Sequence, residues 1–473
     1  MADFVSRFKS TFTHLIDRIS NILGDMGFDT TTNESISDTN PQGSQMSANL
    51  TGPLQSIDWG WEVADQTPDT DTLDIRVYFQ PSGGTVSDDY VSEATYGWSS
   101  NERASAIAAF DQFEAVANVN FTYVTDIDDA DFIMVEYRDT GIDAFLGFFG
   151  LSDSIIYVDG AAVAVNGYGM FNNAGPGWDT AGLTPGGYGY LTLIHEIGHG
   201  MGLAHPHDSG GSSSVMLGVT TNFGSTGTAG LNQGVYTVMT YNDGWLDGPD
   251  GVSPSYDYGY ANGLLALDIA VLQDTYGANT TTRIGNDTYT LFGQNGVSTG
   301  YQAIWDAGGT DTISYSGSRD AVINLTAATL DYSNTGGGVV SYADGIFGGL
   351  TIANGVVIEN ATGGSGDDWL TGNDADNVLN GNAGDDSIQG LGGTDSFFGG
   401  AGADRFIFIA AGGDIGTNTI QDFEDNIDSI EFSFPVQTAV QQGANVLFDF
   451  SDGNTVLVLN ITTDAISDDV LFI

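Results

Sequence analysis

The 473-residue chain contains no cysteine, so no disulfide braces its fold and no thiolate is available to bind a metal. It has only nine basic residues against 62 acidic ones, which gives a formal net charge of −53. Nucleic acid and anionic membrane surfaces repel such a chain, so we expect neither as a partner. A charge this large also strains the folded state by self-repulsion, which bound divalent cations or a saline medium would relieve.

Long apolar runs are missing as well. No stretch approaches the roughly 18 apolar residues of a membrane span, and the first residues lack the apolar core of a secretory signal. Apolar side chains recur there at helical spacing instead: Phe4, Phe8, Phe12, Ile16, Ile19 and Leu23. Two interpretations stay open, a packing helix or a pro-segment helix that lies on the acidic body. Residues 30–50 are polar and lack periodicity, so we interpret them as a linker.

The composition nevertheless supports folded domains, since 41% of the residues are apolar and 11% are aromatic. The length favours two or three domains. Between residues 50 and 277, predicted strands and helices mix, which indicates an α+β domain. The predicted strands are 72–79, 120–125, 131–137 and 154–158, and the predicted helices are 99–119 and 262–277.

Four of the five histidines lie within "LIHEIGHGMGLAHPHD", residues 193–208. On a helix, His195 and His199 are one turn apart and point the same way, so their imidazoles can converge on one metal ion. Glu196 is adjacent to the first ligand and can face the open position of the metal. Incidental histidines on a helix are the alternative for a bare HExxH pattern.

His205 can become a third ligand only if the helix stops and the chain folds back, because a continued helix would carry it about 9 Å further along. Gly202 is the expected breaking point, since glycine accepts the left-handed conformation that ends helices. Pro206 then prevents the helix from resuming. The pattern therefore predicts a three-histidine zinc site with room for a water, whose pKa falls to about 7. Glu196 would take the proton of that water and pass it to a leaving amine.

The segment HEIGHGMGLAH resembles the metzincin pattern H-E-x-x-H-x-x-G-x-x-H. The resemblance implies that Met239, in "VMTYND", is the methionine of the Met-turn beneath the metal. It also implies that Tyr241 is an additional zinc ligand, as in the serralysin and astacin branches, able to swing away and hydrogen-bond the oxyanion. Taken alone, Met239 fits a core residue and Tyr241 a buried polar aromatic. Serralysins usually have a glycine where this chain has His207, which we expect to be a surface residue near the cleft; competition for metal and a tuned pH dependence are alternatives.

Five nonapeptides in register begin at Gly363: GGSGDDWLT, GNDADNVLN, GNAGDDSIQ, GLGGTDSFF and GGAGADRFI. Their sixth position is Asp368, Asn377, Asp386, Asp395 and Asp404, and their eighth position is apolar. Such turns bring carbonyls and carboxylates toward calcium, which takes six to eight oxygen ligands. Stacked repeats would bury the apolar position, and calcium would offset the clustered charge. The second copy, with Asn377, should bind calcium more weakly. A flexible linker rich in glycine and aspartate is the alternative.

These repeats resemble the parallel β-roll (RTX) domain of serralysins, and the segments 282–287, 303–317 and 356–368 resemble serralysin segments that carry calcium ligands. The resemblance implies the calcium ligands Arg283, Gly285, Asp287, Asp306, Gly308, Gly309, Asp311, Val357, Glu359, Gly364, Gly366, Asp368, Asn373, Ala375, Asn377, Asn382, Gly384 and Asp386, and the repeats add Asp395 and Asp404. The last residues, "SDDVLFI", resemble the uncleaved export signal of proteins secreted by ABC transporters; a final edge strand is compatible with that interpretation.

We therefore expect a propeptide and linker at 1–49, a metzincin-like zinc protease domain at 50–277, and an all-β parallel β-roll with a secretion signal at 278–473. The predicted function is a secreted, monomeric zinc endopeptidase of a Gram-negative bacterium, stabilised by several calcium ions and acting on proteins and peptides. The charge alone suggests a marine or salt-loving source. An RTX surface or adhesion protein with an inactive protease domain is the main alternative. A calcium-responsive binding module is another, but it leaves the histidine motif unexplained.

Overall fold

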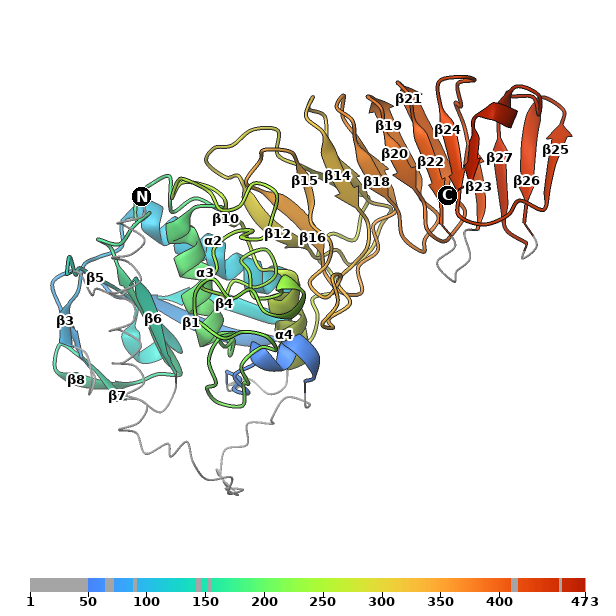
Figure 1. The fold of residues 1–473 in the computed structure, drawn as a ribbon. Helices are drawn as coiled ribbons and strands as arrows, with labels where there is room; N and C mark the ends of the chain where they lie inside the picture. The colour runs from blue at the N-terminus through green and yellow to red at the C-terminus, as the bar shows by residue number, and fades with distance from the viewer. Residues whose placement is uncertain are drawn as a thin grey trace.

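The computed structural model describes residues 50–63, 72–87, 92–141, 146–151, 155–409, 416–450 and 453–472. The helix and linker predicted within residues 1–49 lie outside this range. The described chain forms a mixed helix-and-sheet body followed by an elongated stack of strands (Figure 1). No helix in these described segments is both long enough and apolar enough to cross a membrane.

The body is built on a five-stranded sheet within the described residues. Its strand order is β4 (Val119–Val124), β1 (Leu73–Phe79), β5 (Phe132–Tyr137), β9 (Gly167–Asn172) and β6 (Gly147–Leu151). The first four strands pair in parallel, and β6 runs antiparallel to β9 at the edge. A small antiparallel sheet lies beside it, with β3 (Ser92–Ala94), β2 (Thr85–Ser87), β7 (Ile155–Val158) and β8 (Ala161–Ala164) in that order.

Three helices accompany the sheet in the described residues: α2 (Ser100–Val116), α3 (Tyr188–Gly200) and α4 (Ala266–Tyr276). Helix α2 begins with a capping box, in which the Ser99 hydroxyl accepts from the Glu102 amide and the Glu102 carboxylate accepts from the Ser99 amide. Its buried residues recur at helical spacing, so one face packs on β4 and α3. Helix α3 packs on β6 and β9, and it is buried along almost all of its length. Short 3₁₀ turns are η1 (Gly52–Ser56), η2 (Ile127–Asp129), η3 (Thr228–Gly230) and η4 (Ile466–Asp468).

The elongated part consists of two facing sheets that are mostly parallel. One has the order β10 (Tyr260–Ala261), β12 (Gly300–Ile304), β16 (Gly349–Ile352), β15 (Ser341–Ala343), β14 (Ala321–Asn324), β18 (Trp369–Thr371), β20 (Ser387–Gln389), β22 (Arg405–Phe408), β24 (Ser429–Phe432) and β28 (Val470–Phe472). The other has β11 (Thr288–Thr290), β13 (Thr312–Ser314), β17 (Asn360–Thr362), β19 (Val378–Ala383), β21 (Ser396–Ala401), β23 (Thr417–Ile420), β27 (Thr455–Val458), β26 (Asn445–Asp449) and β25 (Thr438–Gln442).

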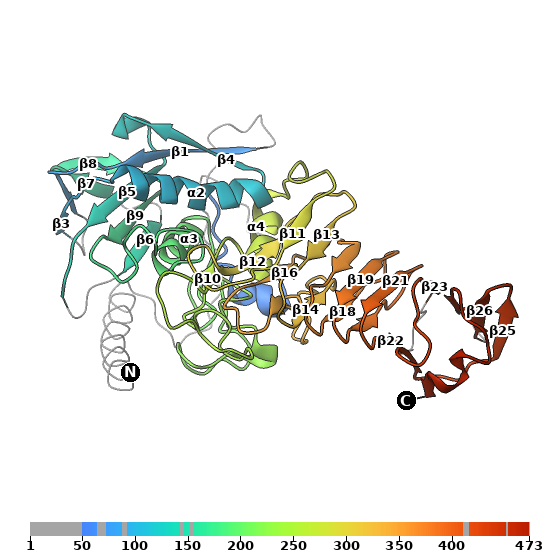
Figure 2. The same ribbon diagram turned by 90° about the horizontal axis from the view of Figure 1, so that it is seen from above.

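Successive nonapeptides enter opposite sheets, so each coil of the stack takes two repeats (Figure 2). The eighth-position side chains Leu370, Leu379, Ile388, Phe397 and Phe406 are each at most 1% exposed and fill the space between the sheets. One repeat cannot enclose this apolar position, whereas the stack does. The predicted parallel β-roll is therefore confirmed.

The body and the roll are joined without a gap in hydrogen bonding or packing. Strand β10, from the body, pairs in parallel with β12 of the roll, and Tyr260 lies opposite Gly300. A single hydrophobic core runs from the body into the roll. The final segment "VLF" forms β28, paired in parallel with β24, and Phe472 is 65% exposed.

Candidate metal centre

Helix α3 ends where the motif requires the chain to turn. The helix stops at Gly200, and Gly202 adopts a φ of +89°, a conformation that glycine accepts most readily. A β-carbon at Gly202 would lie 2.2 Å from the Trp61 carbonyl oxygen, so only glycine fits there. The following residues fold back beside residues 57–59, where the Ala204 amide donates to the Ile57 carbonyl. This reversal brings His205 back toward the helix.

The Nε2 atoms of three histidines converge on one point. His205 Nε2 lies 3.1 Å from His195 Nε2 and 3.0 Å from His199 Nε2. Each Nδ1 lies within 2.9 Å of an oxygen that can only accept: the carbonyls of Val238 and Leu203, and the carboxylate of Asp208. Each Nδ1 therefore carries the hydrogen, and all three Nε2 lone pairs face one another.

This donor set fits zinc. Lone pairs at such short separations repel unless a cation lies between them, and tetrahedral Zn–N bonds of about 2.0–2.1 Å place nitrogens about 3.3 Å apart. Burial, followed by the charge of the neighbouring histidine, lowers the pKa of His195 and of His199 to about 3. Both rings are therefore neutral at pH 7, which is the form that binds a metal.

Glu196 lies next to the first histidine on α3 and is 7% exposed. Its burial raises the pKa to about 8, so in the absence of a nearby cation the carboxyl group holds its proton. Edge strand β6 passes close to it, because a β-carbon on Gly147 would lie 2.8 Å from Glu196 Cγ. A bound divalent cation would lower this pKa and make the carboxylate available as a base.

The turn that contains Met239 lies directly below α3. Met239 is fully buried, and a β-carbon on Gly198 would lie 2.9 Å from its sulfur. Asp268, at the start of α4, holds this turn by accepting from the Thr237 hydroxyl at 2.6 Å and the Val238 amide at 2.8 Å. The Val238 carbonyl in turn accepts from His195. The motifs in the sequence do not single out Asp268. Its local signal is a position in the first turn of α4, where Oδ2 accepts from the Leu265 amide at 3.1 Å, whereas its partners in the Met239 turn are about thirty residues away.

Tyr241 is brought to the histidines, as the resemblance implies. Its ring centroid lies 4.7 Å from that of His205 and 5.9 Å from that of His195. Burial, and then the charges of Glu196 and Asp208, raise the pKa of its phenol well above the ordinary value. The phenol is therefore a hydrogen-bond donor unless a cation withdraws its proton.

The prediction that His207 lies at the surface is wrong. Its side chain is 3% exposed and its ring stacks on His205, with centroids 4.8 Å apart and planes at 17°. The chain reversal at Gly202 turns residue 207 inward, which the local sequence does not reveal. Burial lowers the pKa of His207 to about 4.

A second group of acidic residues gathers at the start of the roll. Carboxylate oxygens of Asp287, Asp306 and Asp311 lie within 4.8 Å of one another. The Asp287 amide donates to Asp311 Oδ1, and the Asp311 amide donates to Glu359 Oε2, both at 2.7 Å. The second oxygen of Asp311 is buried without a hydrogen bond, as a calcium ligand would be.

The turns of the roll repeat one arrangement. The amides of Asp368 and Asp386 each donate to the Oδ1 atom of the aspartate 18 residues further on, Asp386 and Asp404. The remaining Oδ2 atoms of Asp386, Asp395 and Asp404 are buried without a hydrogen-bond partner. Buried carboxylate oxygens require a partner, so these positions fit a hard cation. In the absence of one, burial raises the pKa of Asp386 to about 7.

The imperfect second repeat differs in its hydrogen bonds. Asn377 Oδ1 accepts from the Asn373 amide, and Asn377 Nδ2 donates to the Glu359 carbonyl and to Asn373 Oδ1 at 3.0 Å. The side-chain amide group of Asn377 is therefore satisfied by hydrogen bonds, whereas a buried carboxylate at this position would need a cation as the partner of its second oxygen. The weaker calcium site expected for that repeat stays a prediction.

The other residues implied as calcium ligands lie in stacked turns of the roll. A β-carbon on Gly309 would lie 2.0 Å from the Gly285 carbonyl oxygen, and one on Gly384 would lie 2.0 Å from that of Gly366. The remaining residues of this set are Arg283 and Gly308, both with positive φ, the exposed Val357, and Gly364, Asn373, Ala375 and Asn382. Ala375 faces Gly393, and Asn382 Nδ2 donates to the Gly363 carbonyl.

The ladder of hydrogen bonds from a backbone amide to the Oδ1 atom of the next stacked turn continues beyond the five repeats. This continuation is not among the features predicted from the sequence. The Asp404 amide donates to Asp428 Oδ1, and the Asp395 amide donates to Asn418 Oδ1. Asp428 lies two residues before the buried Ile430, just as Asp386 lies two residues before the buried Ile388. The Asp-x-apolar pattern of the repeats is therefore present here too. The longer spacing of 24 and 23 residues conceals it.

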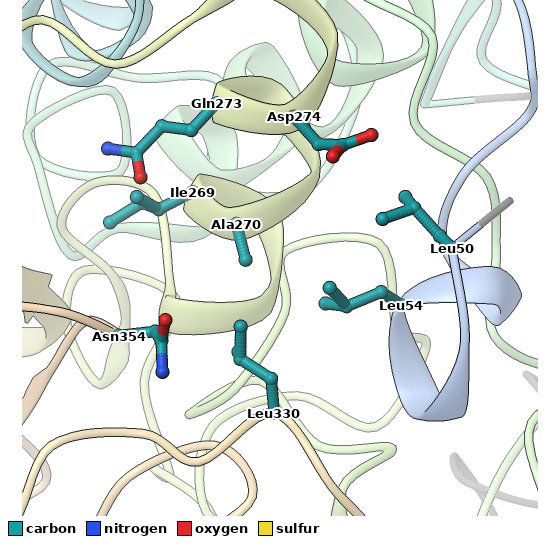
Figure 3. Close-up of a pocket in the computed structure, with 8 residues that line it drawn as sticks. All are labelled: Leu50, Leu54, Ile269, Ala270, Gln273, Asp274, Leu330 and Asn354. Atoms are coloured by element: carbon teal, nitrogen blue, oxygen red, sulfur yellow. The ribbon is translucent and has the colours of Figure 1, made fainter. Parts of the chain in front are cut away.

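A hollow of about 280 Å³ lies elsewhere, between η1, α4 and loops of the roll (Figure 3). Leu50, Leu54, Ile269 and Leu330 supply much of its lining, and none of the residues that line it belongs to the histidine site.

Comparisons with known proteins agree with this geometry. A family model described as "Peptidase M10 serralysin C terminal" matches residues 268–468. A serralysin from Photorhabdus luminescens is 33% identical over 429 residues, which cover 87% of this chain and 81% of that protein. A serralysin from Photorhabdus laumondii subsp. laumondii is 34% identical and covers 78% and 74%.

Metallopeptidase AprA from Pseudomonas marginalis is 34% identical over 289 residues, which are 57% of this chain and 54% of that protein. The chain thus spans about half the length of that relative but most of the two serralysins. With the family model matching the roll and the serralysins extending across the histidine site, the chain belongs to the serralysin family of metallopeptidases.

Proposed function

We propose that this protein is a secreted zinc endopeptidase that hydrolyses peptide bonds of proteins. The observation that carries the proposal is the convergence of three Nε2 lone pairs at 3.0–3.1 Å beside a buried glutamate. His195, His199 and His205 would hold the zinc ion, with Tyr241 as a further ligand. Bound zinc would supply an acidified water and polarise the scissile carbonyl.

Each residue of the site then has a distinct part. Glu196 takes the proton from the attacking water and delivers it to the leaving amine nitrogen. The Tyr241 phenol donates to the oxyanion as charge develops on the carbonyl oxygen. Val238, Leu203 and Asp208 hold the histidine rings through Nδ1, and the Met239 turn forms an apolar floor.

Calcium in the roll has a structural part in this proposal. Asp287, Asp306 and Asp311 would bind it at the start of the roll, and the buried Oδ2 atoms of the repeats would bind further ions along it. We propose the catalytic domain at 50–277 and the roll at 278–473, with 1–49 as a propeptide. Export by an ABC transporter through the C-terminal segment, a monomeric state, and an extracellular location in a Gram-negative bacterium belong to the same proposal.

The alternative is an RTX surface or adhesion protein whose protease-like domain is inactive. The present site argues against it, because an inactive domain has no need of three oriented histidines, Glu196 and Tyr241 in one place. A single measurement of proteolysis distinguishes the two candidate functions.

The experiment compares wild type with Glu196→Ala on casein, after metal analysis of both proteins. We expect one zinc ion in each, and a loss of casein hydrolysis by about 10²- to 10⁴-fold in the variant, because the general base is removed. Gly296→Ala, at a position with open space around it, serves as a control that should retain activity. Equal inertness of zinc-loaded wild type and Glu196→Ala would contradict the proposal.

A further inference from the structure

The ring of Tyr241 is enclosed on several sides by aromatic rings. Its centroid lies 4.3 Å from His207 and 5.4 Å from Phe223, in addition to the two zinc-site histidines. The planes of Tyr241 and Phe223 are close to parallel, at 27°. Neither His207 nor Phe223 has a part in the proposed reaction, yet both are packed against a residue that does.

Hydrogen bonds hold the loop of Phe223, and ring stacking holds His207. The loop of Phe223 is tied to the chain just after Tyr241, because the Gly224 amide donates to Asn242 Oδ1 at 2.6 Å. Asn242 Nδ2 also donates to the Ser225 carbonyl at 3.1 Å. His207 is held by its position two residues after His205 and by stacking on that ring.

We propose that His207 and Phe223 form an aromatic clamp that positions the Tyr241 phenol beside the metal site. The proposal rests on the proposed function, because it assigns Tyr241 its place in the zinc site. Aromatic rings with centroids about 4.5–7 Å apart attract one another, and a ring packed against four other rings has few rotamers available. His207 acts through the shape of its ring, so another flat ring should serve in its place.

The clamp is tested with copper(II) in place of zinc, since a phenolate bound to copper(II) gives a visible charge-transfer absorption. The variants are His207→Gly, His207→Phe, Phe223→Ala and Tyr241→Phe. We expect the absorption to vanish in Tyr241→Phe, to fall at least about twofold in His207→Gly and Phe223→Ala, and to persist in His207→Phe, because only ring packing is at stake.

Kinetics with zinc separate a positioning effect from a general loss of structure. His207→Gly should lower kcat about fivefold with little change in KM, because the phenol acts on the transition state. In a Tyr241→Phe background, the same substitution should have no further effect, since the clamp no longer holds a hydroxyl group. Thermal unfolding of each variant, followed by circular dichroism, reports whether it is folded.

The outcomes distinguish the two proposals. A wild type without the copper absorption and without casein hydrolysis would contradict the proposed function. A wild type with both, whose absorption and kcat are unchanged in His207→Gly and Phe223→Ala, would overturn the clamp alone. Loss of the absorption in His207→Phe, or an equal loss of kcat in both Tyr241 backgrounds, would also overturn it. If His207→Gly does not fold, Phe223→Ala decides by the same criteria.

Discussion

Glu136 and Glu196 are both buried carboxyl groups whose pKa is raised to about 8, yet their surroundings differ. Glu196 lies beside the histidines, where a bound cation would lower its pKa and convert it into a base. Glu136 lies on the central strand β5, is 1% exposed, and has the acidic Glu102 as its charged neighbour. A raised pKa therefore identifies a functional carboxylate only when a use for the proton is present in the same place.

Glu136 should make the protein less stable as pH rises. Burial, and then the charge of Glu102, raises its folded-state pKa from 4.5 to about 8. The unfolded chain therefore releases this proton first, and stability falls between pH 4.5 and 8. We expect Glu136→Gln to be more stable than wild type by about 4 kcal/mol at pH 8 and equal to it near pH 4.

Urea unfolding of both proteins at several pH values, with calcium and zinc present, measures this difference. Other titrating groups are common to the two proteins and cancel. A difference that does not change with pH would show that the pKa of Glu136 is the same in the folded and unfolded protein.

At the scale of the element, the nonapeptide is a turn and a short strand that stack on the repeat 18 residues away. Asp386 and Asn377 occupy the same position of their repeats, but their buried polar atoms have different partners. Asp386 leaves one buried oxygen for a cation, whereas the Asn377 amide bonds to the Glu359 carbonyl and to Asn373. The calcium dependence of the roll should therefore be uneven along its length.

Exchanging the two side chains should change the calcium dependence in opposite directions. Asp386→Asn removes a proposed calcium ligand, so we expect the calcium concentration at half-maximal folding of the roll to rise about tenfold. Asn377→Asp adds a buried charge, so it should destabilise the calcium-free protein and be compensated when calcium is added. Calcium titrations followed by far-ultraviolet circular dichroism measure both effects. Identical titration curves for wild type and Asp386→Asn would show that this turn binds no calcium.

Charge is the property that governs the molecule as a whole. Nine basic residues oppose 62 acidic ones, and three of the nine lie within residues 1–18. In the described chain, Arg76 pairs with Asp131 at 2.8 Å and Arg405 pairs with Glu431 at 3.0 Å. Such pairs offset little of the total charge, so we expect bound calcium ions and dissolved salt to screen most of the repulsion.

Removing calcium should unfold the roll at low salt and much less at high salt. The screening length is about 10 Å at 0.1 M salt and about 3 Å at 1 M, so added sodium chloride weakens the repulsion between stacked aspartates. Scanning calorimetry with a calcium chelator, at both salt concentrations, measures the recovery. A zinc-selective chelator should abolish activity and leave the transition of the roll in place. Lower stability at 1 M salt would contradict this account of the acidity.

The spacing of His195, His199 and His205 could be interpreted from the sequence because all three lie on one helix and the turn that ends it. The five repeats could also be recognised from the sequence, since each nonapeptide has the same pattern of glycine, aspartate or asparagine, and apolar residues. Asp268 and Phe223 could not be found in this way, because each acts on a residue that is distant along the chain. The burial of His207 could not be predicted either, because it depends on where the chain goes after the reversal at Gly202 and on packing against Tyr241.

The sequence by itself determined the family, the three histidines proposed to bind zinc and the existence of a parallel roll, since these depend on short-range spacing and on periodicity. Only the tertiary structure decided which carboxylates are buried without a hydrogen bond, where the ladder continues past Asp404, and what surrounds Tyr241. Those properties depend on burial and on contacts between segments far apart along the chain. A local pattern does not contain that information, because packing of the whole chain determines which of its polar groups lose water.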